Sequence, residues 1–149
     1  MYASASLGGE ALTQSRSLWL LYFYTEANDL LTPFAVGAIL TLARLLEVVD
    51  DPLVGFWSDR TRSRLGRRIP FVLLATPFWT LFAFLLFTPP TSSGAAAAAY
   101  LFLVLELYYL AATLSGGPYE ALLPEIARTS DERVQITGMK VYFGAAGAA

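Results

Sequence analysis

Four ionisable residues lie within eight positions of a long apolar stretch: Arg44, Glu47, Asp50 and Asp51. In a helix the three acids, spaced i, i+3 and i+4, lie on one face. Arg44 belongs to the same face because it precedes Glu47 by three residues and Asp51 by seven. Ionisable groups inside a membrane span are costly and usually mark ion or proton pathways. This spacing therefore indicates a cation site, either for Na⁺ or for a proton.

A structural role is the alternative for this group. Arg44 would then pair with one acid, and Asp50 and Asp51 would lie at the cytoplasmic edge of the membrane. Three acids against one arginine leave an excess of negative charge, so we favour the cation site. Glu106, in the middle of another apolar run, has two interpretations: it lines a cavity, or it is the partner of a helix outside the chain.

The composition restricts the remaining chemistry. The 149 residues include no cysteine and no histidine, 56% are hydrophobic, and the net charge is -2; the mean hydropathy is +0.52. Disulfides, thiolate or imidazole metal ligands and Ser-His catalysis are therefore excluded. The sequence contains no phosphate-binding loop or nucleophile–base pair, so we expect no enzyme and no cofactor beyond a coupling ion, Na⁺ or H⁺. The charge balance does not indicate nucleic acid as a partner.

The apolar runs predict an all-α membrane protein, with the lipid bilayer as its surroundings. A hydrocarbon core about 30 Å thick requires roughly 20 helical residues, and four runs of that length precede the start of a fifth. The first run has a polar half, so it is either a polar tail before a short apolar segment or a full helix that lines a wet cavity. The predicted helices cover residues 3–25, 34–57, 70–87, 95–122 and 134–149.

Arginines are concentrated in alternate loops. The predicted loop 58–69 contains five of them and loop 123–133 contains two, whereas the other two loops contain no Lys or Arg. Positively charged loops favour the cytoplasmic side of a membrane. We therefore expect an integral protein of the cytoplasmic (inner) membrane, with its N-terminus and both arginine loops in the cytoplasm.

Three stretches carry a family resemblance. Gly55–Arg68, GFWSDRTRSRLGRR, resembles the loop between helices two and three of the major facilitator superfamily, with extra residues before Gly66. With its flanks it is similar to the glycoside–pentoside–hexuronide:cation symporters, which include the melibiose permeases. Gly116–Gly144 and Leu18–Glu26 resemble the same family. The resemblance implies that residues 1–149 are the first four to five helices of an N-terminal six-helix half, whose partner is a C-terminal half missing from the chain.

The resemblance also implies functional residues. Members of this family couple the transport of a sugar or glycoside to Na⁺, H⁺ or Li⁺, which acids of helix two bind. Glu47, Asp50 and Asp51 stand at or beside those positions. The implied substrate-binding residues are Glu10, Tyr119, Glu120 and Lys140. The implied charge-pair and gating residues are Arg44, Asp59, Arg60, Arg67 and Arg68.

Two other functions fit the same sequence. One is a transporter of lipids or other small molecules with the same fold, which an apolar lateral cleft would favour. The other is a membrane scaffold that transports nothing. A scaffold would be favoured if Glu47, Asp50 and Asp51 all faced headgroups or the cytoplasm.

Overall fold

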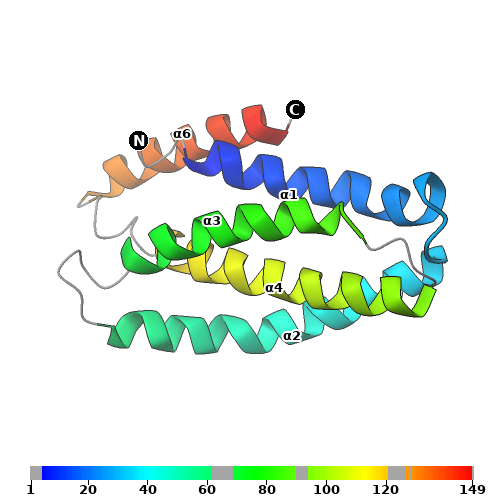
Figure 1. Ribbon diagram of the computed structural model, residues 1–149. Coiled ribbons are helices and arrows are strands. Elements are labelled where there is room, and N and C mark those ends of the chain that lie inside the picture. The colour runs from blue at the N-terminus through cyan, green and yellow to red at the C-terminus, as the bar shows by residue number, and fades with distance from the viewer. Residues whose placement is uncertain (1–4, 62–68, 90–93, 121–126, 128, 149) are drawn as a thin grey trace. The chain divides into compact units, whose positions relative to one another are not determined.

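The computed structural model describes residues 5–61, 69–89, 94–120, 127 and 129–148, without the side chains of residues 5, 17, 18, 59 and 148. Every element within these ranges is helical, which confirms the all-α fold class (Figure 1). The chain forms two units, Leu20–Glu120 and Met1–Trp19 with Ala121–Ala149, and each is described by itself. The elements are α1 (Ala5–Tyr22), η1 (Phe23–Ala27), α2 (Pro33–Arg60), α3 (Ile69–Leu86), α4 (Gly94–Glu120) and α6 (Ser130–Ala148).

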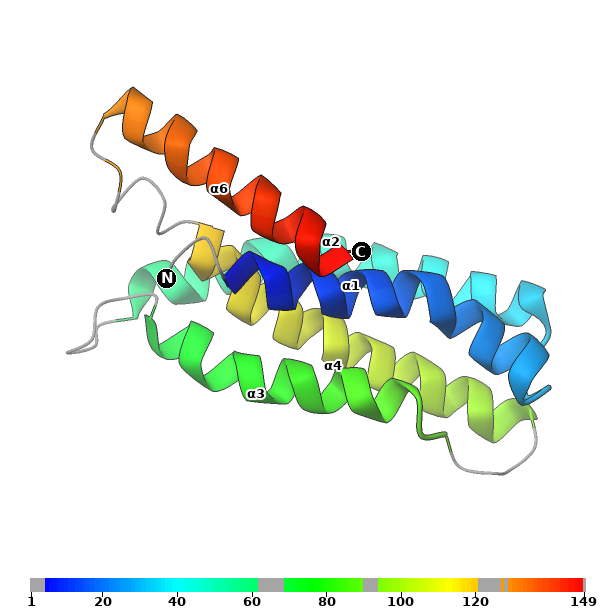
Figure 2. The same cartoon turned by 90° about the horizontal axis from the view of Figure 1, so that it is seen from above.

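In the unit Leu20–Glu120, α4 is the central helix. It packs against both α2 and α3, and the two views agree that it lies between them (Figures 1 and 2). Its middle part supplies much of the core, including Leu101, Leu105 and Tyr108. Tyr24 of η1 is fully buried in the same core and donates a hydrogen bond to the carbonyl of Leu86, at 2.9 Å. The core therefore fixes the register of α4 against its neighbours.

Local signals set the ends of α2. Thr32 is its N-cap, since the hydroxyl accepts a hydrogen bond from the N–H of Ala35 at 3.3 Å, and Pro33 occupies the first turn. The helix continues to Arg60, three residues beyond the predicted end at residue 57. Thr61 donates its hydroxyl to the carbonyl of Trp57 at 2.9 Å and has extended backbone angles, so it closes the helix.

Two of the described helices, α3 and α4, combine the length and the hydropathy of a membrane span. The outer face of α3 is apolar and exposed, with Leu73 62% and Phe84 67% accessible. A large exposed apolar surface of this kind marks contact with lipid or with another protein. The helix α2 is longer, 28 residues, but contains the four ionisable residues of the predicted cation site. The membrane placement of α1, α2 and α6 stays a prediction.

The second unit pairs the first part of α1 with α6. The hydroxyl of Ser6 donates a hydrogen bond to the carbonyl of Lys140 at 3.1 Å. The helix α6 begins at Ser130, before the predicted start at residue 134, because Thr129 and Glu132 form a capping box. The N–H of Glu132 donates to the Thr129 hydroxyl at 3.3 Å, and the N–H of Thr129 donates to the Glu132 carboxylate at 3.2 Å.

Gly147 permits a close approach between α6 and α1. A Cβ at this position would collide with the backbone carbonyl of Leu7, whereas a Cβ at Gly138 of the same helix would meet nothing within 4 Å. We expect Gly147→Ala to destabilise the whole protein by about 1–3 kcal/mol through overpacking. Gly138→Ala is the matched control and is expected to be neutral or to stabilise by up to about 1 kcal/mol. Thermal unfolding in detergent measures both, and equal midpoints would contradict the close approach.

Candidate functional site

One face of α2 is apolar in its first part and acidic further along the helix. Val36, Ile39 and Ala43 are buried, and the same helical spacing continues to Glu47 and Asp50, which are half-buried. The apolar part of this face packs in the core beside α4. The buried residues Val54 and Ser58 continue the same spacing beyond them, so Glu47 and Asp50 lie on the inner face of α2.

Arg44 pairs with the first of the three acids. Its Nη1 lies 2.7 Å from Oε2 of Glu47, one helical turn further along. Its guanidinium also lies over the ring of Tyr109 from α4, 5.0 Å from the ring centroid, a geometry that favours a cation. The pair expected from the sequence therefore forms, and an aromatic ring of α4 supports it.

Asp51 is linked directly to α4. The hydroxyl of Thr113 donates a hydrogen bond to Oδ1 of Asp51, at 2.9 Å. A hydrogen bond to a carboxylate stabilises the charged form and fixes its orientation. Although Asp51 is exposed within the described chain, its carboxylate is held toward α4 and not turned away from the bundle.

Glu106 of α4 joins this group from the opposite side. The charges of Asp50 and Glu47 act on its carboxylate, so Glu106 lies within electrostatic range of these two acids of α2. Its Oε1 is buried and has no hydrogen-bond partner in the described part of the chain. Of the two interpretations that the sequence left for Glu106, proximity to the acids of α2 favours the cavity residue.

The boundary between α2 and α4 thus holds more negative than positive charge. Within the described ranges of α2 and α4, the four carboxylates of Glu47, Asp50, Asp51 and Glu106 are accompanied there by the guanidinium of Arg44. Among the residues that the structure describes, no three acidic side chains are grouped closely enough to hold a metal ion. These four acids, called the acidic row below, are therefore separate carboxylates on two helices, and a cation site at Glu47, Asp50 and Asp51 stays a prediction.

Thr113 is the residue of this site that sequence reasoning missed. Glu106, Tyr109 and Thr113 follow one another at i, i+3 and i+7, so they share a face of α4. That face meets the acidic part of α2. The spacing was available in the sequence, but it gains meaning only when the register between the two helices is known.

The other predicted residues of this unit lie near the helix ends. Tyr119 is half-buried and Glu120 exposed at the C-terminal end of α4. Arg60 ends α2, with its guanidinium 3.9 Å from the centroid of the Phe56 ring. The side chain of Asp59, and the residues Arg67 and Arg68, lie outside the described part of the chain.

Glu10 and Lys140 both belong to the unit formed by α1 and α6. Glu10 is exposed on α1, and its side chain lies beside Gly144 of α6. The backbone carbonyl of Lys140 accepts the hydrogen bond from Ser6. These two residues are thus on packed neighbouring helices, and their part in binding a substrate stays a prediction.

Comparisons with known proteins place these features in context. The family model described as MFS/sugar transport protein matches residues 1–149. The symporter YnaJ of Bacillus subtilis, named as uncharacterized, is 31% identical over 142 residues, which is 95% of this chain and 30% of YnaJ.

Two further relatives carry names that specify a substrate. The isoprimeverose transporter of Lactiplantibacillus pentosus is 28% identical over 136 residues, 89% of this chain and 27% of that protein. The sodium-dependent lysophosphatidylcholine symporter 1 of Xenopus tropicalis is 31% identical over 110 residues, 73% of this chain and 21% of that protein. The chain therefore spans about a third or less of the length of the curated relatives it matches.

Proposed function

Because the chain belongs to the MFS sugar transport proteins, the family whose model covers residues 1–149, we propose that it forms part of a cation-coupled symporter for a sugar or glycoside. The resemblance to the glycoside–pentoside–hexuronide:cation symporters is confirmed by this match. The chain is an integral membrane protein, as its apolar helices and transporter relatives indicate. Since it spans only part of its relatives' length, the proposal concerns the whole transporter.

The observation that supports this function is the acidic row between α2 and α4. Glu47 and Asp50 lie on the inner face of α2, and Asp51 is held by Thr113. Ionisable groups at membrane depth are kept where they serve transport, and carboxylate oxygens suit a hard cation such as Na⁺ or a proton. A scaffold role is disfavoured because Glu47 and Asp50 are half-buried and Asp51 accepts a hydrogen bond from Thr113 of α4.

In this mechanism the cation neutralises part of the row when it binds at Glu47, Asp50 and Asp51. The lower electrostatic repulsion lets α2 and α4 close on a substrate held near the bilayer midplane, where transporters of this kind bind their ligands. Glu10, Tyr119, Glu120 and Lys140 are the proposed substrate-binding residues. Because coupling is reciprocal, bound substrate increases the affinity for the cation by the same factor by which the cation increases the affinity for substrate.

The proposed orientation places the N-terminus and the end of α2 in the cytoplasm, at the inner membrane. The excess of arginine after α2 supports it. Arg44, Asp59, Arg60, Arg67 and Arg68 are the proposed charge-pair and gating residues, since ion pairs on the cytoplasmic side would hold the outward-facing state. Cysteine labelling from either side of the membrane, at a cysteine introduced in place of Thr61, tests the orientation.

The experiment that tests the function is uptake into proteoliposomes that contain the whole transporter. A panel of labelled glycosides and pentosides is offered with an inward Na⁺ gradient, an inward H⁺ gradient, or neither. We expect at least one glycoside to accumulate only with one of the two gradients. Accumulation without any gradient, or of none of the sugars, would contradict sugar symport.

A lipid transporter of the same fold is the second candidate. An apolar cavity between α3 and α4 and the similarity to a lysophosphatidylcholine symporter favour it. Labelled lysophosphatidylcholine therefore belongs in the same panel. Sodium-dependent uptake of this lipid, without uptake of any sugar, would establish the second candidate in place of the first.

The hydrogen bond from Thr113 to Asp51 provides a prediction of its own. Thr113→Val keeps the shape of the side chain but removes the donor, so Asp51 loses both orientation and stabilisation of its charge. Hydrogen bonds to charged groups contribute about 1.5–3 kcal/mol, so the affinity for a coupling Na⁺, which needs an oriented carboxylate, is expected to fall about tenfold. If the coupling ion is H⁺, the proton affinity is expected to rise by a similar factor, because the charged carboxylate loses its hydrogen bond. Thr113→Ser keeps the hydroxyl and is expected to retain most of the affinity. Titration of the transport rate with the coupling cation compares the two variants, and equal affinities would show that the hydroxyl has no part in binding.

A further inference from the structure

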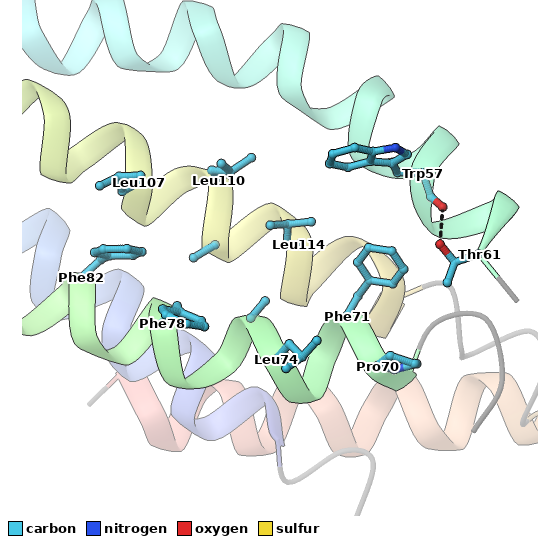
Figure 3. A pocket seen from close by; sticks show the side chains of 12 residues that line it. Trp57, Thr61, Pro70, Phe71, Leu74, Phe78, Phe82, Leu107, Leu110 and Leu114 are labelled. Carbon is cyan, nitrogen blue, oxygen red and sulfur yellow. Dashed lines mark hydrogen bonds between the residues drawn. The ribbon is translucent and has the colours of Figure 1, made fainter. Parts of the chain in front are cut away.

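An apolar cavity lies apart from the acidic row, between α3, α4 and the end of α2. Its volume is about 490 Å³, and all of its lining residues except Thr61 are apolar. The hydroxyl of Thr61 is used in its hydrogen bond to the carbonyl of Trp57. Figure 3 shows Trp57 and Thr61 near one end and Phe82 and Leu107 near the other. The cavity is therefore an elongated apolar groove that presents no hydrogen-bonding group to a polar ligand, and it is called the groove below.

The length of this groove matches the depth of one leaflet of a bilayer. Along α3 it extends from Pro70 to Phe82, and twelve residues of helix at 1.5 Å each span about 18 Å. Half of a hydrocarbon core about 30 Å thick is about 15 Å. Both α3 and α4 have the length and hydropathy of membrane spans. A straight hydrocarbon chain lying along these two helices would thus fill the groove from the interface to the midplane.

Positive charge accompanies one end of the groove. Arg60 is exposed and immediately precedes Thr61, which lines the groove beside Trp57. Its guanidinium stacks on the ring of Phe56, so it is held at the end of α2. Arginine donates several hydrogen bonds in a fixed fork that suits phosphate oxygens. The apolar groove complements the acyl tail of a lipid, and the guanidinium at its end complements an anionic headgroup.

We propose that this groove binds one acyl chain of an anionic phospholipid from the bilayer, with the phosphate at Arg60. The site is separate from the acidic row, and it requires that α3 and α4 span the membrane and that the rest of the whole transporter leaves the groove open to lipid. The lipid is a resident of the surrounding leaflet and not the transported molecule. It would seal the boundary between α3, α4 and the end of α2.

The test is native mass spectrometry of the whole transporter in neutral detergent, titrated with phosphatidylglycerol or phosphatidylcholine of identical acyl chains. We expect one phosphatidylglycerol to bind about tenfold more tightly than the first phosphatidylcholine. Leu74→Trp fills the groove and is expected to weaken the first bound lipid at least fivefold for both headgroups. Leu73→Trp is the matched control, since Leu73 is a similarly exposed neighbour on α3 outside the lining.

The headgroup contact is tested with a second pair of variants. Arg60→Gln is expected to reduce phosphatidylglycerol affinity to that of phosphatidylcholine, whereas Arg60→Lys keeps most of the preference.

Equal effects of the tryptophan variants at 73 and 74 would show only nonspecific lipid binding and overturn the site. So would an undiminished preference in Arg60→Gln. A fall in the unfolding temperature of lipid-free Leu74→Trp, with lipid binding unchanged, would show that another part of the protein fills the groove. Loss of lysophosphatidylcholine transport in Leu74→Trp would show a substrate in its place.

Discussion

Asp51→Asn is expected to remove the cation dependence of substrate binding. The change keeps the size of the side chain and its ability to accept the hydrogen bond from Thr113, but it eliminates one negative charge. Removing a charge partner from a site of this kind costs about 2–5 kcal/mol, which corresponds to a loss of cation affinity of at least about thirtyfold. Substrate affinity of the purified transporter, measured without the cation and at the lowest cation concentration that saturates the wild type, gives the result.

Two comparisons make this experiment specific. Asp51→Glu retains the charge on a longer side chain, so it should keep cation dependence with altered affinity. Asp29→Asn changes an exposed acid in the connection between η1 and α2, where no role in cation binding is proposed, and should behave as wild type. Cation dependence that survives unaltered in Asp51→Asn would remove Asp51 from the site.

Arg44→Gln is expected to change cation affinity in the opposite direction. In the structure the guanidinium is paired with Glu47 at 2.7 Å, so it competes with an incoming cation for that carboxylate. At an effective dielectric constant of about 20, two unit charges repel by about 1.7 kcal/mol even at a separation of about 10 Å, and by more at closer range. Removing the guanidinium should therefore tighten cation binding by roughly tenfold.

The control for Arg44 is a substitution that keeps the charge. Arg44→Lys should leave cation affinity near that of wild type, although a lysine loses the planar stacking on Tyr109. Direct titration of the cation in the absence of substrate separates the two variants. Weaker binding in Arg44→Gln would mean that the guanidinium holds Glu47 in position for the cation and does not compete with it.

Helix-scale features of the fold were predictable because they depend on local chemistry. Apolar runs with turn residues between them located five helical regions, and the positions of Glu47, Asp50 and Asp51 on α2 follow from the helical repeat alone. The early start of α6 was also encoded locally, since Thr129 and Glu132 have the spacing of a capping box. That signal lies inside what the hydropathy pattern predicted as a loop.

Contacts between helices were not predictable in the same way. The bond between Thr113 and Asp51 and the proximity of Glu106 to Asp50 depend on how α2 and α4 are set against one another. That register is fixed by the packing of core residues such as Ala43, Leu105 and Tyr109. These residues come from helices that are distant in the sequence. A single sequence gives the face of each helix but not the neighbour that the face meets.

The central claim is that a cation bound at the acids of α2 increases the affinity for substrate. The most direct measurement is a reciprocal titration of the whole transporter: substrate affinity with and without the cation, and cation affinity with and without substrate. The account predicts that both ratios exceed one, that they are equal, and that both fall to one when Glu47, Asp50 and Asp51 are replaced by Gln, Asn and Asn. Equal ratios above one in this triple variant would contradict it, because the coupling would then be located elsewhere in the protein.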